Sequence, residues 1–151
     1  MDWHELERAA PDFAAAGIRL LAQGDGAPIG FLATAHRALH LAPVCPIFCD
    51  GAIYLSVGAT TPKRRDLDRD GRYVLHAFLA PRDEEFRIAG RATLVADGGD
   101  RVREQNAIRF GAFGRDDPIY RLGIDRVMWG YWENAGKPGT RPIRRLFPER
   151  R

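Results

Sequence analysis

The sequence of 151 residues has little of several residue types, and each shortage excludes a class of protein. Only two cysteines are present, Cys45 and Cys49, which are too few for the disulfide framework of a small secreted protein. On a regular strand they would share one face and lie about 13 Å apart, too far for a mutual disulfide. We therefore expect both to be buried small apolar residues rather than metal ligands.

Long apolar runs are also missing. No stretch approaches the roughly 20 apolar residues that a membrane-spanning helix needs. Residues 1–5 lack the basic segment followed by an apolar one that marks a signal peptide. These absences favour a cytoplasmic protein without a membrane partner, and a chain of this length predicts a single domain over residues 1–151.

Catalytic and metal-binding patterns are equally scarce. Ser56 is the only serine, and it lies inside a strand pattern rather than in a nucleophile elbow. His4, His36, His40 and His76 do not follow metal-binding spacings, so no metal site is expected and the catalytic residues stay unknown. His76 alone stands out, because it lies in mid-strand among apolar neighbours.

The net charge is +3 with a pI near 9.2, and nearly all of the positive charge is arginine, since Lys63 and Lys137 are the only lysines. The cations are scattered among acids, apart from a one-signed C-terminal tail that contains Arg141, Arg144, Arg145, Arg150 and Arg151. No nucleic-acid-binding motif accompanies the tail, so a nucleic-acid partner is not favoured.

What the sequence does contain is a distinctive stretch over residues 53–67. A β-branched and aromatic segment ends at Gly58, which permits a turn that other residues resist. Thr60 or Thr61 can then cap a helix that has Pro62 in its first turn. The next three residues are Lys63, Arg64 and Arg65.

Cations are unusual at the start of a helix, where the helix dipole is already positive. Free backbone N–H groups and side-chain cations would converge there, which suits a phosphate. The local residues leave two interpretations open: a phosphate site, or a capped surface helix with solvated arginines.

Hydrophobic periodicity and turn residues predict the other elements. Helices are expected over residues 3–10, 12–23, 62–69 and 101–110, and Asp2 and Glu5 should form a capping box at the first. Gly17 weakens the prediction of the second helix. Strands are expected over residues 29–35, 40–50, 52–57, 72–80, 85–96 and 125–133, Pro118 should open one further helical turn, and residues 142–147 are strand-like.

Pro43 and Pro46 interrupt the expected strand over residues 40–50. Proline removes ladder donors, so this strand should lie at a sheet edge, carry a bulge or bend. Six short strands with mostly hairpin-length links predict a mainly β (α+β) fold: a six-stranded antiparallel β-barrel with flanking helices.

The order of these segments resembles a known family. Phe31–Thr34 is followed by Pro-Val-Cys-Pro-Ile-Phe at residues 43–48, by Asp50–Leu55 and by Thr-Pro-Lys-Arg-Arg-Asp-Leu at residues 61–67. Asp70–Tyr73, a strand with His76, and Glu85–Ala92 come next. Together they are similar to the pyridoxamine 5′-phosphate oxidase-like family of FMN-binding split barrels.

The resemblance implies a homodimer with FMN at the subunit interface, N-terminal helices over residues 1–28 and a tail over residues 135–151. Lys63 would bind the FMN phosphate, helped by Arg64, Thr61 and Thr60. Backbone facing the isoalloxazine and ribityl groups would come from Pro43, Val44, Cys45 and Pro46 and from Ser56, Val57 and Gly58. Glu85 stands where the family's oxidases place a glutamine from the other subunit, and Trp132 or Trp129 would come from the C-terminal cofactor-side segment.

Departures from the authentic oxidase pattern limit the expected activity. The oxidase places arginine and lysine at the positions of Pro43 and Phe48 and arginine at that of Pro62, and its C-terminal substrate-binding segment has no convincing copy here. A shorter relative is expected, an FMN-dependent oxidoreductase acting on an unidentified small molecule. The alternatives are a deazaflavin-dependent reductase and a non-catalytic flavin- or haem-binding module.

Overall fold

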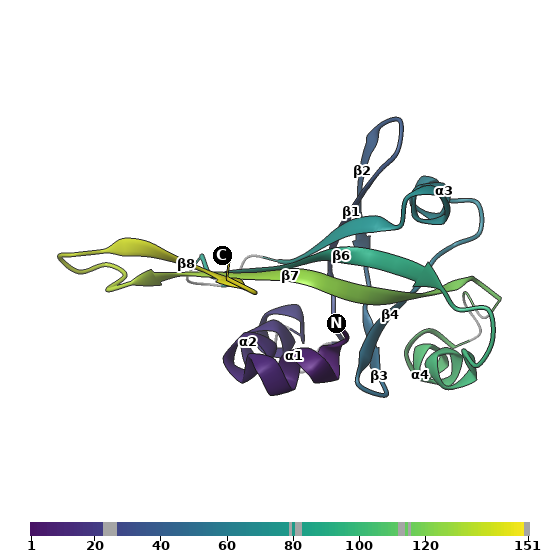
Figure 1. Cartoon of the computed structure of the whole chain (residues 1–151), viewed down its shortest axis with the longest axis horizontal. Coiled ribbons are helices and arrows are strands. Elements are labelled where there is room, and N and C mark those ends of the chain that lie inside the picture. The colour runs from purple at the N-terminus through teal and green to yellow at the C-terminus, as the bar shows by residue number, and fades with distance from the viewer. Residues whose placement is uncertain (23–26, 79, 81–82, 112–113, 115, 150–151) are drawn as a thin grey trace.

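The computed structural model describes the whole chain except residues 23–26, 79, 81–82, 112–113, 115 and 150–151 (Figure 1). The helices are α1 (Trp3–Ala9), α2 (Pro11–Ala22), α3 (Pro62–Arg69) and α4 (Asp100–Phe110). The strands are β1 (Gly30–Ala35), β2 (Leu39–Val44), β3 (Ile47–Cys49), β4 (Ala52–Ser56), β5 (Arg72–Ala77), β6 (Glu85–Leu94), β7 (Ile119–Glu133) and β8 (Arg141–Phe147). Gln23, Arg150 and Arg151, for which the sequence made predictions, lie outside the described residues. No helix in the described part of the chain is both long and apolar enough to cross a membrane.

All strands join one curled antiparallel sheet in the order β2-β1-β5-β6-β7-β4-β3, with β8 pairing with β7. The two end strands, β2 and β3, are consecutive in the chain and are separated only by Cys45 and Pro46. One continuous segment therefore supplies both ends of the sheet. This confirms that the proline-containing segment lies at an edge and bends.

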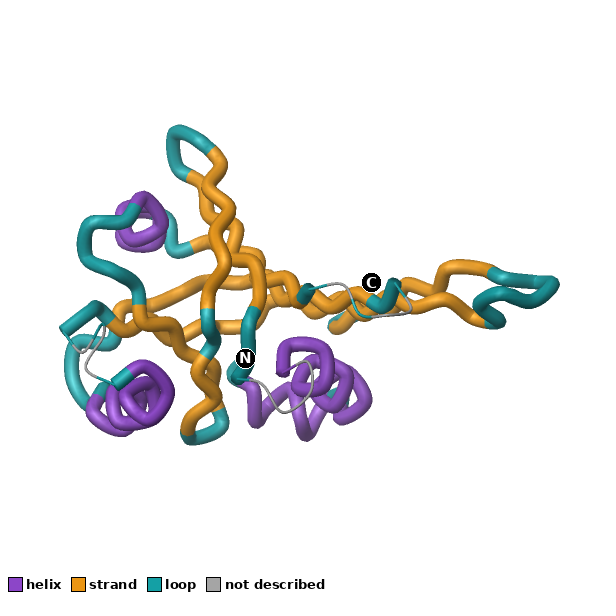
Figure 2. Tube along the Cα trace, turned by 180° about the vertical axis from the view of Figure 1, so that it is seen from behind, coloured by secondary structure: helices purple, strands orange, loops and turns teal. Residues whose placement is uncertain are grey.

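The mainly β (α+β) class is confirmed, but the prediction of six strands is wrong, because the described residues form eight. The expected single strand over residues 40–50 is two strands, since Pro46 cannot donate to a ladder. The strand-like tail also pairs fully with β7 as β8. Together β7 and β8 form a ribbon that extends beyond the body of the molecule (Figure 2).

Strand β7 begins six residues earlier than predicted, and the helical turn expected at Pro118 is wrong. Instead, the Val57 N–H donates to the Pro118 carbonyl at 3.0 Å, and the strand starts at the next residue. Ile119, Tyr120 and Leu122 are buried, because this first part of β7 lies between β4 and β6. Pairing with two strands that are distant in the sequence thus determines the secondary structure of a segment whose local pattern was ambiguous.

Helices α1 and α2 cover one side of the sheet (Figure 1) and complete the main core. Their buried residues pack with those of the strands around Phe86, which is fully buried. Gly17, which weakened the helix prediction, is buried in α2. A β-carbon at Gly17 would lie 2.5 Å from the Phe86 ring and 2.7 Å from Trp3, so the glycine allows a close approach of helix and sheet.

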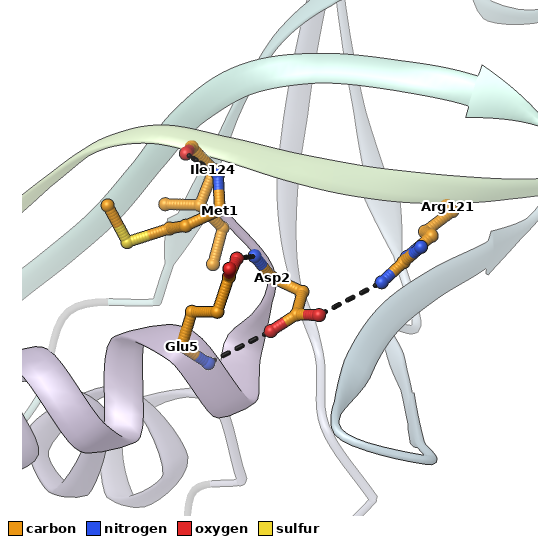
Figure 3. A network of polar contacts seen from close by, with 5 residues as sticks. All are labelled: Met1, Asp2, Glu5, Arg121 and Ile124. Atoms are coloured by element: carbon orange, nitrogen blue, oxygen red, sulfur yellow. Dashed lines mark hydrogen bonds and ion pairs between the residues drawn. The ribbon is translucent and has the colours of Figure 1, made fainter.

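The chain start is fastened to the sheet through the predicted capping box, which the structure confirms (Figure 3). The Glu5 N–H donates to Asp2 Oδ1 at 2.9 Å, and the Asp2 N–H donates to Glu5 Oε2 at 2.7 Å. Arg121 donates to the same aspartate at 3.0 Å, and the Met1 ammonium donates to the Ile124 carbonyl at 2.9 Å. Both of these partners belong to β7, so the start of α1 is held on that strand.

Both cysteines are free thiols, as predicted, and Cys49 is buried whereas Cys45 is partly buried. Cys49 packs with Ile47, Val102 of α4 and Ile119 in a second, smaller core. Burial raises the pKa of the Cys49 thiol, with a further contribution from Asp50. A buried thiol of this kind behaves as a small apolar side chain.

Candidate functional site

The turn between β4 and α3 is stabilised by Thr61. Its backbone N–H and its hydroxyl both donate to the Gly58 carbonyl, at 3.1 and 2.8 Å. Thr61 occupies the N-cap position of α3, but its hydroxyl makes no capping bond to the helix. Because Pro62 has no N–H and the first turn contains no acidic residue, the N–H groups that follow have no side-chain acceptor from the cap or from that turn.

Of the three successive cations, Lys63 is the one left available. Arg64 Nε donates to Asp68 Oδ2 at 2.8 Å, and Arg65 is exposed, with a long contact of 3.5 Å to the Thr60 carbonyl. Lys63 is partly buried, and no described residue forms a hydrogen bond or ion pair with its ammonium. A lysine in this position is a point charge suited to a phosphate.

Arg64 already has a partner on its own helix. Asp68 accepts hydrogen bonds from the Tyr120 hydroxyl and from Arg64. The bond from Tyr120, with that from Arg64, lowers the pKa of Asp68 although partial burial opposes the shift. Arg64 is thus paired within α3, and Asp68 joins the helix to β7 through Tyr120. That Arg64 helps to bind phosphate stays a prediction.

Helix α3 is anchored to the sheet by a buried carboxylate. Asp66 is only 4% exposed, and its Oδ2 lies 2.7 Å from Thr34 Oγ1 of β1 and 2.7 Å from His40 Nδ1 of β2. Burial alone would raise the pKa of Asp66, but the hydrogen bonds from His40 and Thr34 outweigh burial and lower it. Sequence reasoning missed this cluster. The available signal was the position of Asp66 next to Leu67, the only apolar residue of the helix besides Pro62.

The backbone predicted to face the cofactor ring comes from two segments of the chain. The register of β3 and β4 pairs Ile47 with Tyr54, and the pairing ends there, one residue after Pro46. Val44 and Pro46 are buried, Pro43 is exposed, and Val57 donates its N–H to the neighbouring loop. Residues 56–58 lead into the turn before α3, whereas residues 43–46 lie at the junction of β2 and β3.

Two other predicted residues lie elsewhere. Glu85 begins β6 opposite Gly130, and Trp132 lies on β7, 42% exposed. With Arg144 they line a small pocket of about 180 Å³ at the base of the β7–β8 ribbon. Figure 1 shows this ribbon and α3 at opposite ends of the molecule. One copy of the chain therefore does not bring Glu85 and Trp132 to the Lys63 turn.

Space for Glu85 depends on Gly130, where an added β-carbon would lie 2.7 Å from the glutamate side chain. Arg144 Nε lies 3.4 Å from Glu85 Oε1, and His76 Nε2 lies 3.8 Å from Oε2. His76 Nδ1 lies 2.5 Å from the Ala77 carbonyl, which places the proton on Nδ1 and directs Nε2 towards the glutamate. Within the described residues, no group of three or more histidine, cysteine or acidic side chains could hold a metal ion.

No protein-family model matches the sequence, and no curated protein matches it. Solved structures do match. A candidate pyridoxamine 5′-phosphate oxidase from Listeria innocua is 16% identical, with a TM-score of 0.59 over 73% of this chain and 91% of that one. HutZ, a haem storage protein from Vibrio cholerae, is 12% identical, with a TM-score of 0.59 over 77% of this chain and 89% of that one.

A haem-binding protein from Mycobacterium smegmatis is 22% identical, with a TM-score of 0.57 over 87% of this chain. This chain spans 57% of the mycobacterial protein's length. The chain has the fold of the pyridoxamine 5′-phosphate oxidase-like split barrels. The resemblance in the sequence predicted that fold.

Proposed function

We propose that the protein is an FMN-binding oxidoreductase that acts on a small molecule and holds the FMN phosphate at the Lys63 turn. The observation that carries the proposal is the Lys63 ammonium, which has no partner among the described residues and lies at a helix start without first-turn acids. Bound FMN would supply the hydride chemistry, whereas the protein supplies binding and orientation.

The donor set at the turn fits a phosphate. Lys63 would contribute charge, and the free N–H groups of the first turn of α3 would contribute hydrogen bonds. The Thr61 hydroxyl would keep the turn rigid through its bond to Gly58. The bent segment around Cys45 and Pro46 would lie along the ring, because proline leaves backbone groups outside the sheet ladder.

A homodimer would complete the site. Glu85 and Trp132 lie at the base of the β7–β8 ribbon, away from α3, so they could reach the cofactor only in a second copy. The edge strand β2 also exposes two large apolar side chains, Leu39 at 83% and Leu41 at 68%. Exposed apolar surface of this kind is typical of a protein–protein contact.

The first test compares two neighbouring cations on α3. The Lys63→Ala variant should bind FMN about 10- to 100-fold more weakly, since a hydrogen bond to a charged group contributes about 1.5–3 kcal/mol. The Arg65→Ala variant removes an exposed charge two residues away and should change the affinity little. Titration of FMN followed by visible absorbance and flavin fluorescence measures both. Wild-type protein that shows no FMN-dependent spectral change or thermal stabilisation would exclude the proposal.

Two other cofactors remain candidates. A deazaflavin with a phosphate would use the same turn, so the FMN titration should be repeated with such a compound. Haem is favoured by the two structural neighbours that are named for it. Titration with hemin should give a sharp Soret band if haem is the ligand, and this band should not depend on Lys63.

A further inference from the structure

Helix α3 has almost no apolar packing to hold it. Leu67 is its only buried apolar side chain, and the remaining residues are charged apart from Pro62. An isolated helix of eight residues is not stable in water. Polar contacts must therefore contribute to the position of the helix and of its first turn.

The buried polar contacts of α3 centre on Asp66. Its Oδ2 meets Thr34 of β1 and His40 of β2, so one carboxylate joins the helix to both strands of a hairpin. Lys63 precedes Asp66 by three residues, which places the two side chains on neighbouring turns of one helix face. A shift of Asp66 would therefore move the start of the helix and the lysine with it.

We propose that Asp66 is a positioning residue of the anion-binding turn: held by Thr34 and His40, it fixes the helix start that presents Lys63. This inference rests on the proposed function, because it concerns the same turn. It adds a residue that does not touch the ligand, and it makes the β1–β2 hairpin part of the ligand's support.

A purely electrostatic role and a positioning role of Asp66 predict opposite changes in anion affinity when its negative charge is removed. Removal of a negative charge close to an anion should strengthen anion binding if the charge acts only through space. Loss of the anchor should weaken binding, because a displaced Lys63 loses its contact with the phosphate, as in the Lys63→Ala variant. The sign of the change therefore separates the two effects.

The experiment compares Asp66→Asn with Asp68→Asn in the full-length protein. Both variants remove one negative charge from α3. Asp68 is exposed and meets the Tyr120 hydroxyl of β7 rather than the hairpin, so its replacement leaves the buried contacts of Asp66 in place. Affinities for FMN and for riboflavin, which lacks the phosphate, are measured by fluorescence titration. We expect Asp66→Asn to weaken FMN binding by at most the roughly 10- to 100-fold expected for Lys63→Ala and to leave riboflavin binding nearly unchanged. Asp68→Asn should leave FMN binding unchanged or stronger.

Equal losses for FMN and riboflavin in Asp66→Asn would show a general structural defect and overturn the inference, as would unchanged or tighter FMN binding. Amide hydrogen exchange gives a second measurement that needs no ligand. Residues 63–69 should lose protection in Asp66→Asn while β5 and β6 keep theirs. If α3 stays protected, the inference is wrong whether or not FMN binds. If wild-type protein binds no FMN but α3 loses protection as expected, the proposed function fails and the anchoring role of Asp66 stands.

Discussion

Lys63 and Asp66 carry opposite charges in opposite surroundings, although they lie three residues apart. The lysine has no partner among the described residues, whereas the aspartate is buried and accepts two short hydrogen bonds. A charge without a partner at a helix start is costly unless a ligand shares it, while a buried charge needs its partners at all times. The first residue is thus suited to binding and the second to support.

The lowered pKa of Asp66 predicts acid sensitivity. Its pKa lies below the ordinary 3.8 in the folded protein, so the ionised carboxylate stabilises the fold above that pH. This stabilisation is lost as the pH falls through the folded-state pKa. Urea unfolding should therefore give a free energy that decreases more steeply below about pH 4 in wild-type protein than in Asp66→Asn.

Asp12, Asp68 and Asp70 also have lowered pKa values, so both proteins should lose some stability in acid. The difference between the two slopes of unfolding free energy against pH measures the contribution of the Asp66 carboxylate to stability. Parallel slopes for the two proteins would contradict the stated role of its carboxylate.

Elements with strong local signals were predicted well. Pro62 at the start and Asp70-Gly71 at the end fixed the bounds of α3 correctly, because helix starts and stops depend on nearby residues. The split of the segment over residues 40–50 and the early start of β7 were not predictable in the same way, since pairing with distant strands decides them. The Lys63 turn could be read from adjacent residues, whereas Asp66 was missed because its partners come from β1 and β2.

Gly17 of α2 offers a test at the scale of the element. Alanine has a higher helix propensity than glycine by about 1 kcal/mol, which would stabilise an exposed helix. Here the added β-carbon would meet Phe86 at 2.5 Å and Trp3 at 2.7 Å. Overpacking of a core costs about 1–3 kcal/mol, so it should outweigh the gain in propensity.

We therefore expect Gly17→Ala to lower the unfolding midpoint in urea and in heat. Gly99 provides a control, since a β-carbon there would have no neighbour closer than 3.8 Å. Gly99→Ala should change stability by much less. An increase in stability for Gly17→Ala would show that α2 and the sheet can separate at little cost.

At the scale of the whole molecule, the predicted site residues fall into two separate regions of the described chain. The Lys63 turn lies at the start of α3, while Glu85 and Trp132 lie at the base of the β7–β8 ribbon. The residues of each group could be predicted from the sequence, but their separation within one copy of the chain could not. A two-stranded ribbon is marginally stable by itself, which is a further reason to expect a partner for it.

A mixed dimer tests this division most directly. Lys63→Ala removes one half of the site and Trp132→Ala the other, so each variant alone should bind FMN weakly in both of its sites. A heterodimer purified with two different tags should contain one doubly impaired site and one intact site. Titration should then give one FMN per dimer at wild-type affinity. A heterodimer that binds no better than its parents, or a protein that stays monomeric with FMN bound, would contradict a site shared between two copies.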